Sequence, residues 1–231
     1  MRHLELPLLP HVKKDSPFLL IDSELDKLPT QLISNAPWAT TQEKPEVEFV
    51  MAHSGDCLFL KYYVTEQHVL ARYRQPNDPV YKDSCVELFI SFQNDPAYYN
   101  IEFNCLGTCR IGFGPERHNR KLLPPATIAK IRSSGTLRAG NSASHKKAWQ
   151  LTLVIPISIF SEHQLASLES EEHARVNFCK CGDELPEPHF LTWNMIQAPE
   201  PNFHLPEFFG TVKFLSSRPQ PAEHASVGHS R

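Results

Sequence analysis

Carboxylate and amide side chains occupy alternate positions in two neighbouring segments of this chain. Glu87 lies in residues 84–92, and Asn100, Glu102 and Asn104 lie in residues 98–105, each flanked by apolar residues. Because successive side chains of a strand point to opposite faces, the pattern predicts two strands, each with one apolar and one polar face. Carboxylates and amides placed in this way can bind the hydroxyl groups of a sugar. We therefore take the polar face as the candidate site.

Aromatic residues that could form the walls of a sugar site stand near these strands. The flat face of an aromatic ring can lie against the C–H side of a sugar ring. Tyr81 follows a polar loop, Trp193 follows the turn-rich residues 181–188, and Arg175 and Asn177 add hydrogen-bonding groups. We predict that Tyr81 and Trp193 are exposed stacking residues. The alternative is that Trp193 belongs to the core, as a tryptophan in a β-protein more often does.

The length and charge of the chain exclude several classes of protein. Its 231 residues, 41% of them hydrophobic, are enough for one all-β domain with a proper core. A net charge of -3, from 23 basic and 26 acidic residues, offers no basic excess for a nucleic acid. No apolar stretch is long enough to span a bilayer, and residues 1–14 lack the apolar run of a signal peptide. We expect a soluble protein that is cytoplasmic as the chain stands.

Short apolar runs separated by proline and glycine predict an all-β fold. About a dozen strands favour a two-sheet antiparallel β-sandwich with short helical turns. The expected strands cover residues 17–22, 47–53, 57–65, 68–74, 84–92, 98–105, 110–113, 128–133, 148–156, 175–181, 189–193 and 209–214. His53-Ser54-Gly55-Asp56 predicts a hairpin turn, and residues 161–173 have helical spacing. Trp38 and Trp149 are expected in the core.

The domain prediction has three parts. Residues 1–36 are expected to form an arm that packs on the sandwich, residues 37–215 the sandwich itself, and residues 216–231 a disordered tail. Residues 115–127 and 135–147 are expected to be long surface loops. The six cysteines fit no disulfide framework, so we expect most of them to be reduced and buried. A metal cluster of Cys179, Cys181 and His189 is the alternative for part of this set.

Three runs of sequence together carry a resemblance to a known family. They are residues 77–87, which end in Asp-Ser-Cys-Val-Glu, residues 98–104 with Gly107, and the closing pattern from Trp193 to Phe209-Gly210. Over roughly residues 37–214 the chain resembles the family 9 carbohydrate-binding modules. More specifically, it looks like the carbohydrate-binding family 9-like branch of the wider DOMON-like sandwiches, which have an immunoglobulin-like jelly-roll architecture.

The resemblance implies a β-sandwich that grips the end of a plant polysaccharide between two aromatic side chains, in carbohydrate catabolism. By position, Tyr81 stands where the family usually has a tryptophan, and Trp193 would form the other wall. Glu87 and Asn104 would bind sugar hydroxyls. The resemblance implies no catalytic residue and no cofactor other than structural calcium, which some members bind. Such modules usually accompany a glycoside hydrolase, which makes a hydrolase the expected protein partner.

Three alternatives stay open at this stage. Glu87 and Glu102 on adjacent strands could reach the separation of about 5 Å that a retaining glycosidase needs, which would make the chain a hydrolase of O-glycosyl bonds. We favour a non-enzyme, because carboxylates on a sugar-facing sheet also serve as hydroxyl acceptors. A third class, a protein-interaction sandwich without a small ligand, would leave the polar face merely solvated.

A haem-binding redox module is the remaining alternative, because related DOMON sandwiches hold a haem between a methionine and a histidine. It would need Met51 or Met195 opposite a strand histidine such as His53, His68 or His189.

Overall fold

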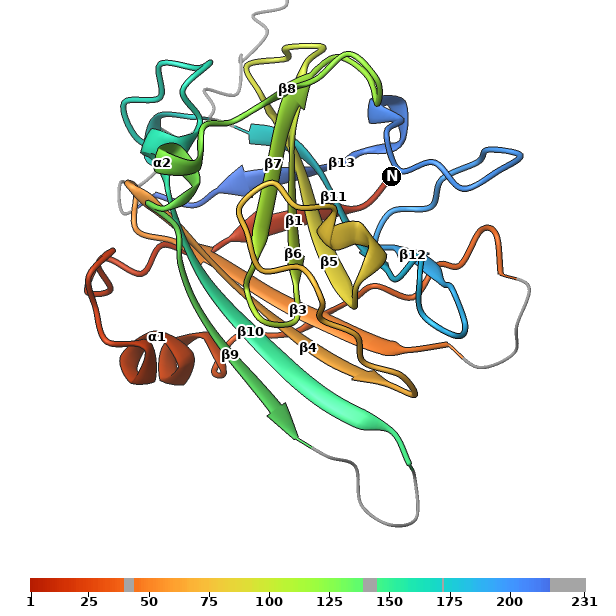
Figure 1. The fold of residues 1–231 in the computed structure, drawn as a ribbon. Coiled ribbons are helices and arrows are strands. Elements are labelled where there is room, and N and C mark those ends of the chain that lie inside the picture. The colour runs from red at the N-terminus through yellow and green to blue at the C-terminus, as the bar shows by residue number, and fades with distance from the viewer. Residues whose placement is uncertain (40–43, 139–144, 172, 217–231) are drawn as a thin grey trace, which may run out of the picture.

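Two β-sheets packed face to face form the body of the protein (Figure 1). The computed structural model describes residues 1–39, 44–138, 145–171 and 173–216. The larger sheet has eight strands in the order β1-β13-β11-β5-β6-β7-β8, with β12 beside β11, and the smaller sheet has the order β2-β3-β4-β10-β9. All neighbouring strands described in both sheets are antiparallel except β1 and β13, which are parallel. The predicted β-sandwich is thus confirmed.

The strands of the larger sheet are β1 (His3–Leu6), β5 (Cys85–Phe92), β6 (Tyr98–Asn104), β7 (Cys109–Gly114), β8 (Lys121–Leu122), β11 (His173–Cys181), β12 (Phe190–Thr192) and β13 (Gly210–Phe214). Those of the smaller sheet are β2 (Gln31–Leu32), β3 (Glu46–His53), β4 (Cys57–Glu66), β9 (Arg132–Arg138) and β10 (Lys147–Pro156). The helices are α1 (Phe18–Leu25), α2 (Pro125–Ile128) and the 3-10 turns η1 (Val80–Lys82), η2 (Ile157–Ile159), η3 (Leu168–Ser170) and η4 (Pro206–Phe208).

The main core fills the space between the sheets, and the period-two patterns point into it as predicted. Val86, Leu88 and Ile90 of β5 pack in this core, as does Trp149 of β10. The alternate residues of β5, β6 and β11 point away from it, to the outer face of the larger sheet, where a second apolar cluster forms around Phe89. A polar group on this outer face is therefore covered by η1, β12 and loops, and not by the second sheet.

A buried ion pair joins the two sheets at one end of the core. Lys180 Nζ of β11 lies 2.8 Å from Glu66 Oε2 of β4, and Trp149 Nε1 donates to Glu66 Oε1 at 2.6 Å. Burial by itself raises the pKa of Glu66, but the charge of Lys180 and these hydrogen bonds outweigh it and lower the pKa. Burial and the charge of Lys180 together lower the pKa of His189 to about 4.

The segment expected as a strand over residues 17–22 is instead helix α1, which lies on the outer face of the smaller sheet (Figure 1). The prediction was wrong because a short apolar run fits either a strand or one face of a helix. Ile21 and Leu25 stand four residues apart, so a helix buries both on one side and leaves Leu19 exposed. Pro17 precedes the first turn of α1.

The strand expected over residues 68–74 was also wrong. The backbone N–H groups of Arg72 and Tyr73 donate to the carboxylate of Asp83 at 3.0 Å instead of to a neighbouring strand. Here the carboxylate of Asp83, and not a neighbouring strand, accepts these backbone hydrogen bonds. The spacing of apolar residues in the sequence does not indicate such a contact.

Elsewhere the expected elements have different bounds. The strand expected over residues 128–133 begins later, as β9, and occupies part of the loop expected over residues 135–147. Within the described part of residues 161–173 the helical structure is confined to η3. The hairpin at residues 53–56 is confirmed: it joins β3 to β4, with Gly55 at φ +88°.

The first 36 residues contribute to both sheets through β1 and β2. Of the predicted tail, residues 217–231 lie outside the described residues. No helix among the described residues is long and apolar enough to cross a membrane.

Candidate functional site

A pocket of about 300 Å³ lies on the outer face of the larger sheet. Glu87 of β5 and Glu102 of β6 line it, and they face each other directly in the strand register. Cys181 of β11 also lines the pocket. The alternation that sends the apolar residues of these strands into the core places these polar residues in the pocket.

Three aromatic side chains line the pocket. They are Tyr81 of η1, Phe190 of β12 and Phe203 in the loop before η4. Phe190 and Phe203 stand edge to face with ring centroids 6.1 Å apart, and Trp38 packs on Phe203 at 5.9 Å. Trp38 is itself held by a hydrogen bond from Nε1 to the Ala198 carbonyl at 2.8 Å. The pocket thus has aromatic surface of the kind that packs on a sugar ring.

The carboxyl groups of the pocket have raised pKa values. Burial raises the pKa of Glu87, although Asn100 Nδ2 donates to Oε2 at 2.8 Å and Cys181 Sγ to Oε1 at 3.2 Å. Burial and the neighbouring charge of Glu87 raise the pKa of Glu102 well above its ordinary value. Burial also raises the pKa of Asp183. A carboxyl group that is partly protonated can both donate to and accept from a hydroxyl group.

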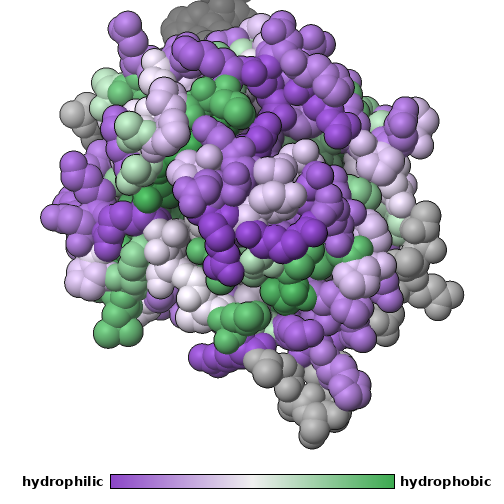
Figure 2. Space-filling model, in the orientation of Figure 1, coloured by the Kyte–Doolittle hydropathy of each residue, from purple (hydrophilic) through white to green (hydrophobic). Residues whose placement is uncertain are grey.

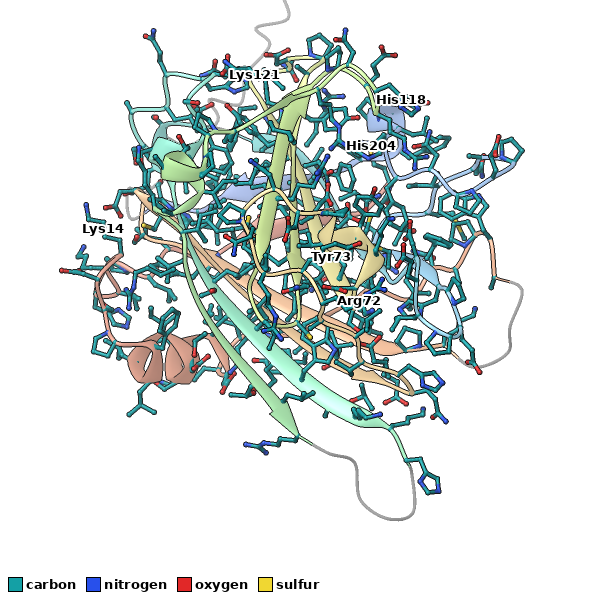
Figure 3. All side chains as sticks on the ribbon, in the orientation of Figure 1. Lys14, Arg72, Tyr73, His118, Lys121 and His204 are labelled. Atoms are coloured by element: carbon teal, nitrogen blue, oxygen red, sulfur yellow. The ribbon has the colours of Figure 1, made fainter. Side chains whose placement is uncertain are left out.

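Basic side chains gather on the same pocket. Arg110 comes from β7, while Arg117, His118 and Arg120 come from the loop between β7 and β8. Arg110 Nε and Arg120 Nη1 each lie 3.8 Å from Glu102 Oε1. His204 approaches from the loop after β12, and Figure 3 shows it close to His118. Two loops distant in sequence therefore supply groups to one pocket.

Two of the six predicted sugar-binding residues, Tyr81 and Glu87, line this pocket. Asn104 is the last residue of β6 and lies on the same face, but it is fully buried. Its Nδ2 donates to the Tyr73 carbonyl at 2.9 Å and to Asp83 Oδ2 at 3.0 Å, and its Oδ1 accepts from backbone N–H groups of residues 106 and 108. Asn104 therefore stabilises the turn after β6 and does not line the pocket.

The other predicted residues lie elsewhere. Arg175 Nη2 donates to the Asp95 carbonyl at 2.7 Å, and the amide of Asn177 bonds the backbone of Asn194. Trp193 is 0% exposed and packs edge to face on Phe178 in the main core, with centroids 5.6 Å apart. We correct its expected role as a wall, because a ring without exposed surface offers no face to a ligand here.

The sequence interpretation missed Arg110, Arg120, Phe190, Phe203 and His204 as pocket residues. A signal existed for Arg110, because it is the register partner of Glu102 on β7. Phe203 and His204 lie in an irregular segment rich in proline, where no periodicity indicates which way a side chain points.

One group of side chains in the described part of the chain has the spacing of metal ligands. The ligand atoms of Cys85, Glu87 and Cys181 lie within 4.8 Å of one another, and all three residues are buried. Two thiols do not suit calcium, which takes oxygen ligands, so this group does not fit the calcium considered above. The suggested set of Cys179, Cys181 and His189 is not brought together, because His189 bonds Lys180, whose side chain points to the other face of β11.

All six cysteines are buried and free, as expected. The haem alternative would need Met51 or Met195 as a ligand opposite a strand histidine. Met51 packs in the main core, while Met195 is 48% exposed. The candidate histidine His53 has its Nε2 3.0 Å from the Leu215 carbonyl.

Most of the surface shown in Figure 2 is hydrophilic, with hydrophobic residues in separate patches.

Together, the two-sheet sandwich and a polar, aromatic pocket on one outer face define a β-sandwich of the ligand-binding type. The family model for carbohydrate-binding family 9 matches residues 17–214. The chain belongs to carbohydrate-binding family 9.

Solved structures agree with this assignment. A "putative carbohydrate-binding protein" from Bacteroides uniformis is 32% identical, with a TM-score of 0.83 over 93% of this chain and 99% of that one. A family 9 module from Caldicellulosiruptor kristjanssonii, solved with glucose, is 12% identical and has a TM-score of 0.58 over 95% of this chain and 100% of that one. Its cellotriose complex aligns at 11% identity with a TM-score of 0.58, over 100% of both chains. No curated protein matches this chain significantly.

Proposed function

We propose that this protein binds the end of a plant-type polysaccharide or oligosaccharide, without catalysis, in the pocket on the outer face of the larger sheet. The observation that supports this best is the combination of three aromatic side chains with carboxyl and guanidinium groups in one pocket. A volume of about 300 Å³ is at the lower end for small-molecule sites, which favours a chain end over a long internal stretch. The proposal includes a role in carbohydrate catabolism beside a glycoside hydrolase, which membership of the family supports.

The proposed roles follow from the placement of each side chain. Tyr81 and Phe190, both half-buried, present ring surface to the sugar. Glu87 and Glu102 accept and donate hydrogen bonds at the floor of the pocket. We propose that the binding uses hydrogen-bonding groups of the chain alone, without a cofactor.

Isothermal titration of glucose, xylose, galactose, cellobiose and xylobiose tests this proposal. We expect binding in the micromolar to millimolar range, weakened about tenfold by Phe190→Ala. Phe18→Ala is the matched control, because Phe18 is a half-buried aromatic residue on α1, beside the other sheet. No heat with any of these sugars, or equal effects of the two substitutions, would contradict the proposal.

A hydrolase remains the second candidate, because two carboxyl groups with raised pKa values face each other in the pocket. Incubation with cellobiose and xylobiose, followed by chromatography of the products, separates the two functions. The non-catalytic proposal expects intact disaccharides. Monosaccharide release that Glu87→Gln abolishes in a folded protein would replace it.

A further inference from the structure

The pocket has more permanent positive charge than binding a neutral sugar requires. Three arginines line it, Arg110, Arg117 and Arg120, and a guanidinium group stays charged at any physiological pH. The opposing carboxyl groups are those of Glu87, Glu102 and Asp183. Burial raises the pKa of all three, which disfavours their charged forms, whereas the guanidinium groups keep their charge.

The arginines are held mainly by neutral groups. Arg120 Nη1 donates to Asn100 Oδ1 at 2.5 Å and its Nε to the Arg117 carbonyl at 3.0 Å. Arg110 Nη1 donates to the Asn77 carbonyl at 2.7 Å. Both guanidinium groups lie 3.8 Å from Glu102 Oε1, which is beyond hydrogen-bond distance. Their orientation therefore does not depend on a carboxylate, and their charge is only partly offset.

Unused hydrogen-bond donors remain in this arrangement. Arg110 Nε is buried and has no hydrogen-bond partner among the described residues. A buried donor without a partner is costly to leave unsatisfied, unless a ligand completes it. Arg117 is exposed and forms no ion pair or side-chain hydrogen bond with any residue that the structure describes.

A neighbouring histidine responds to the same positive charge. His204 lines the pocket, with Nδ1 3.1 Å from the hydroxyl group of Tyr98 on β6. Burial lowers its pKa to about 2, and the charges of Arg120, Arg117 and His118 all act in the same direction. His204 is thus neutral at ordinary pH and can serve as a hydrogen-bonding group of the site.

We infer that the pocket is built for an acidic saccharide, a sugar residue carrying a carboxylate, whose acid group meets the cluster of Arg110, Arg117 and Arg120. A guanidinium group matches a carboxylate with two parallel hydrogen bonds, and such charge-assisted bonds are stronger than neutral ones. The sugar ring lies against Tyr81 and Phe190, and its hydroxyl groups meet Glu87 and Glu102. The inference rests on the proposed function and adds the chemical class of the ligand.

Calorimetry with matched acidic and neutral sugars tests it. Glucuronic and galacturonic acid are compared with glucose and galactose at neutral pH, together with the methyl ester of galacturonic acid. We expect each acid to bind at least about tenfold more tightly than its neutral counterpart. The ester has no charge and is expected to bind like the neutral sugar. Raising the salt concentration is expected to weaken binding of the acids only.

Arg117→Gln is the test variant, because Arg117 is exposed and its loss leaves no buried group without a partner. We expect it to weaken binding of the acids about tenfold more than it weakens binding of glucose. Arg138→Gln, at an exposed position of β9 in the other sheet, removes the same charge far from the pocket and is the control.

Three results would overturn the inference. Neutral sugars that bind as tightly as the acids would refute the acidic ligand and leave the proposed function standing. Inorganic phosphate that binds as tightly as the uronic acids would show a general anion site instead of a saccharide site. No binding of any sugar, acidic or neutral, would refute both the inference and the proposed function.

Discussion

Glu102→Gln is the substitution whose effect on stability the structure defines most sharply. The side chain of Glu102 is 3% exposed, and its Oε2 has no hydrogen-bond partner among the described residues. Burial and the charge of Glu87 raise its pKa well above the ordinary value of 4.5. Glutamine has nearly the same shape as a protonated glutamate but cannot ionise. The variant therefore removes a titration and changes little else.

The sign of the effect follows from proton binding. Between pH 4.5 and the higher pKa of the folded state, the folded protein binds a proton at Glu102 that the unfolded chain has released. The free energy of unfolding of the wild type therefore falls as the pH rises, by about 1.4 kcal/mol for each pH unit and each such proton. In the Glu102→Gln protein, position 102 does not titrate, so this fall in the free energy of unfolding with pH is absent. The variant should be about as stable as the wild type near pH 5, and the stability difference in its favour should grow as the pH rises toward the raised pKa of Glu102.

Urea unfolding of both proteins at half-unit steps from pH 5 to pH 8 measures this difference. Other titrating groups affect both proteins, so they cancel in the difference between the two curves. Glu87 is the exception, because its charge raises the pKa of Glu102 and so contributes to the measured difference. Glu5→Gln, at an exposed position of β1, is the control and should give a curve parallel to the wild type. Parallel curves for Glu102→Gln would refute the reasoning.

Three further substitutions test other parts of the structure. Lys180→Met leaves Glu66 buried without its cation and should lower the free energy of unfolding in urea by about 3–5 kcal/mol. The control is Lys27→Met, at an exposed surface ion pair. A smaller loss of stability for Lys180→Met than for Lys27→Met would contradict the buried ion pair. Trp193→Phe should cost about 1–3 kcal/mol without changing sugar affinity, and a loss of affinity at full stability would restore Trp193 as a wall. Gly55→Ala should cost about 1–2 kcal/mol because its φ is +88°, and an unchanged melting temperature would contradict that conformation.

Much of the fold could be predicted from the sequence because a strand with one buried face has a clear period. The alternation in β5 and β6 correctly predicted which residues enter the core and that Glu87 and Glu102 share the opposite face. The apolar run at residues 17–22 was ambiguous because it is too short to distinguish periods of 2 and 3.6. For residues 68–74, the hydrogen bonds that the backbone N–H groups of Arg72 and Tyr73 donate to Asp83 depend on a contact that only the folded chain creates.

The candidate site was less predictable, for a related reason. Its floor comes from regular strands, whereas Phe203, His204 and Arg117 come from loops, where no periodicity determines the direction of a side chain. Trp193 illustrates the opposite error. Its chemistry suits a sugar site, but the tryptophan packs inside the sandwich. The absence of a side chain at Gly210 makes room for the ring: a Cβ atom on residue 210 would stand 2.5 Å from the nearest ring atom of Trp193. The chemistry of a residue type does not determine which side of a sheet it occupies.

The energetic cost of the pocket is an argument for its function. The larger sheet already has an apolar layer on its outer face around Phe89 and Phe209, so apolar residues at positions 87 and 102 could extend it. The chain instead buries two adjacent carboxyl groups and leaves the Nε of Arg110 without a partner among the described residues. Each of these features lowers the stability of the free protein. A ligand that satisfies them would recover that free energy on binding, which is the arrangement expected of a site and not of a solvated face.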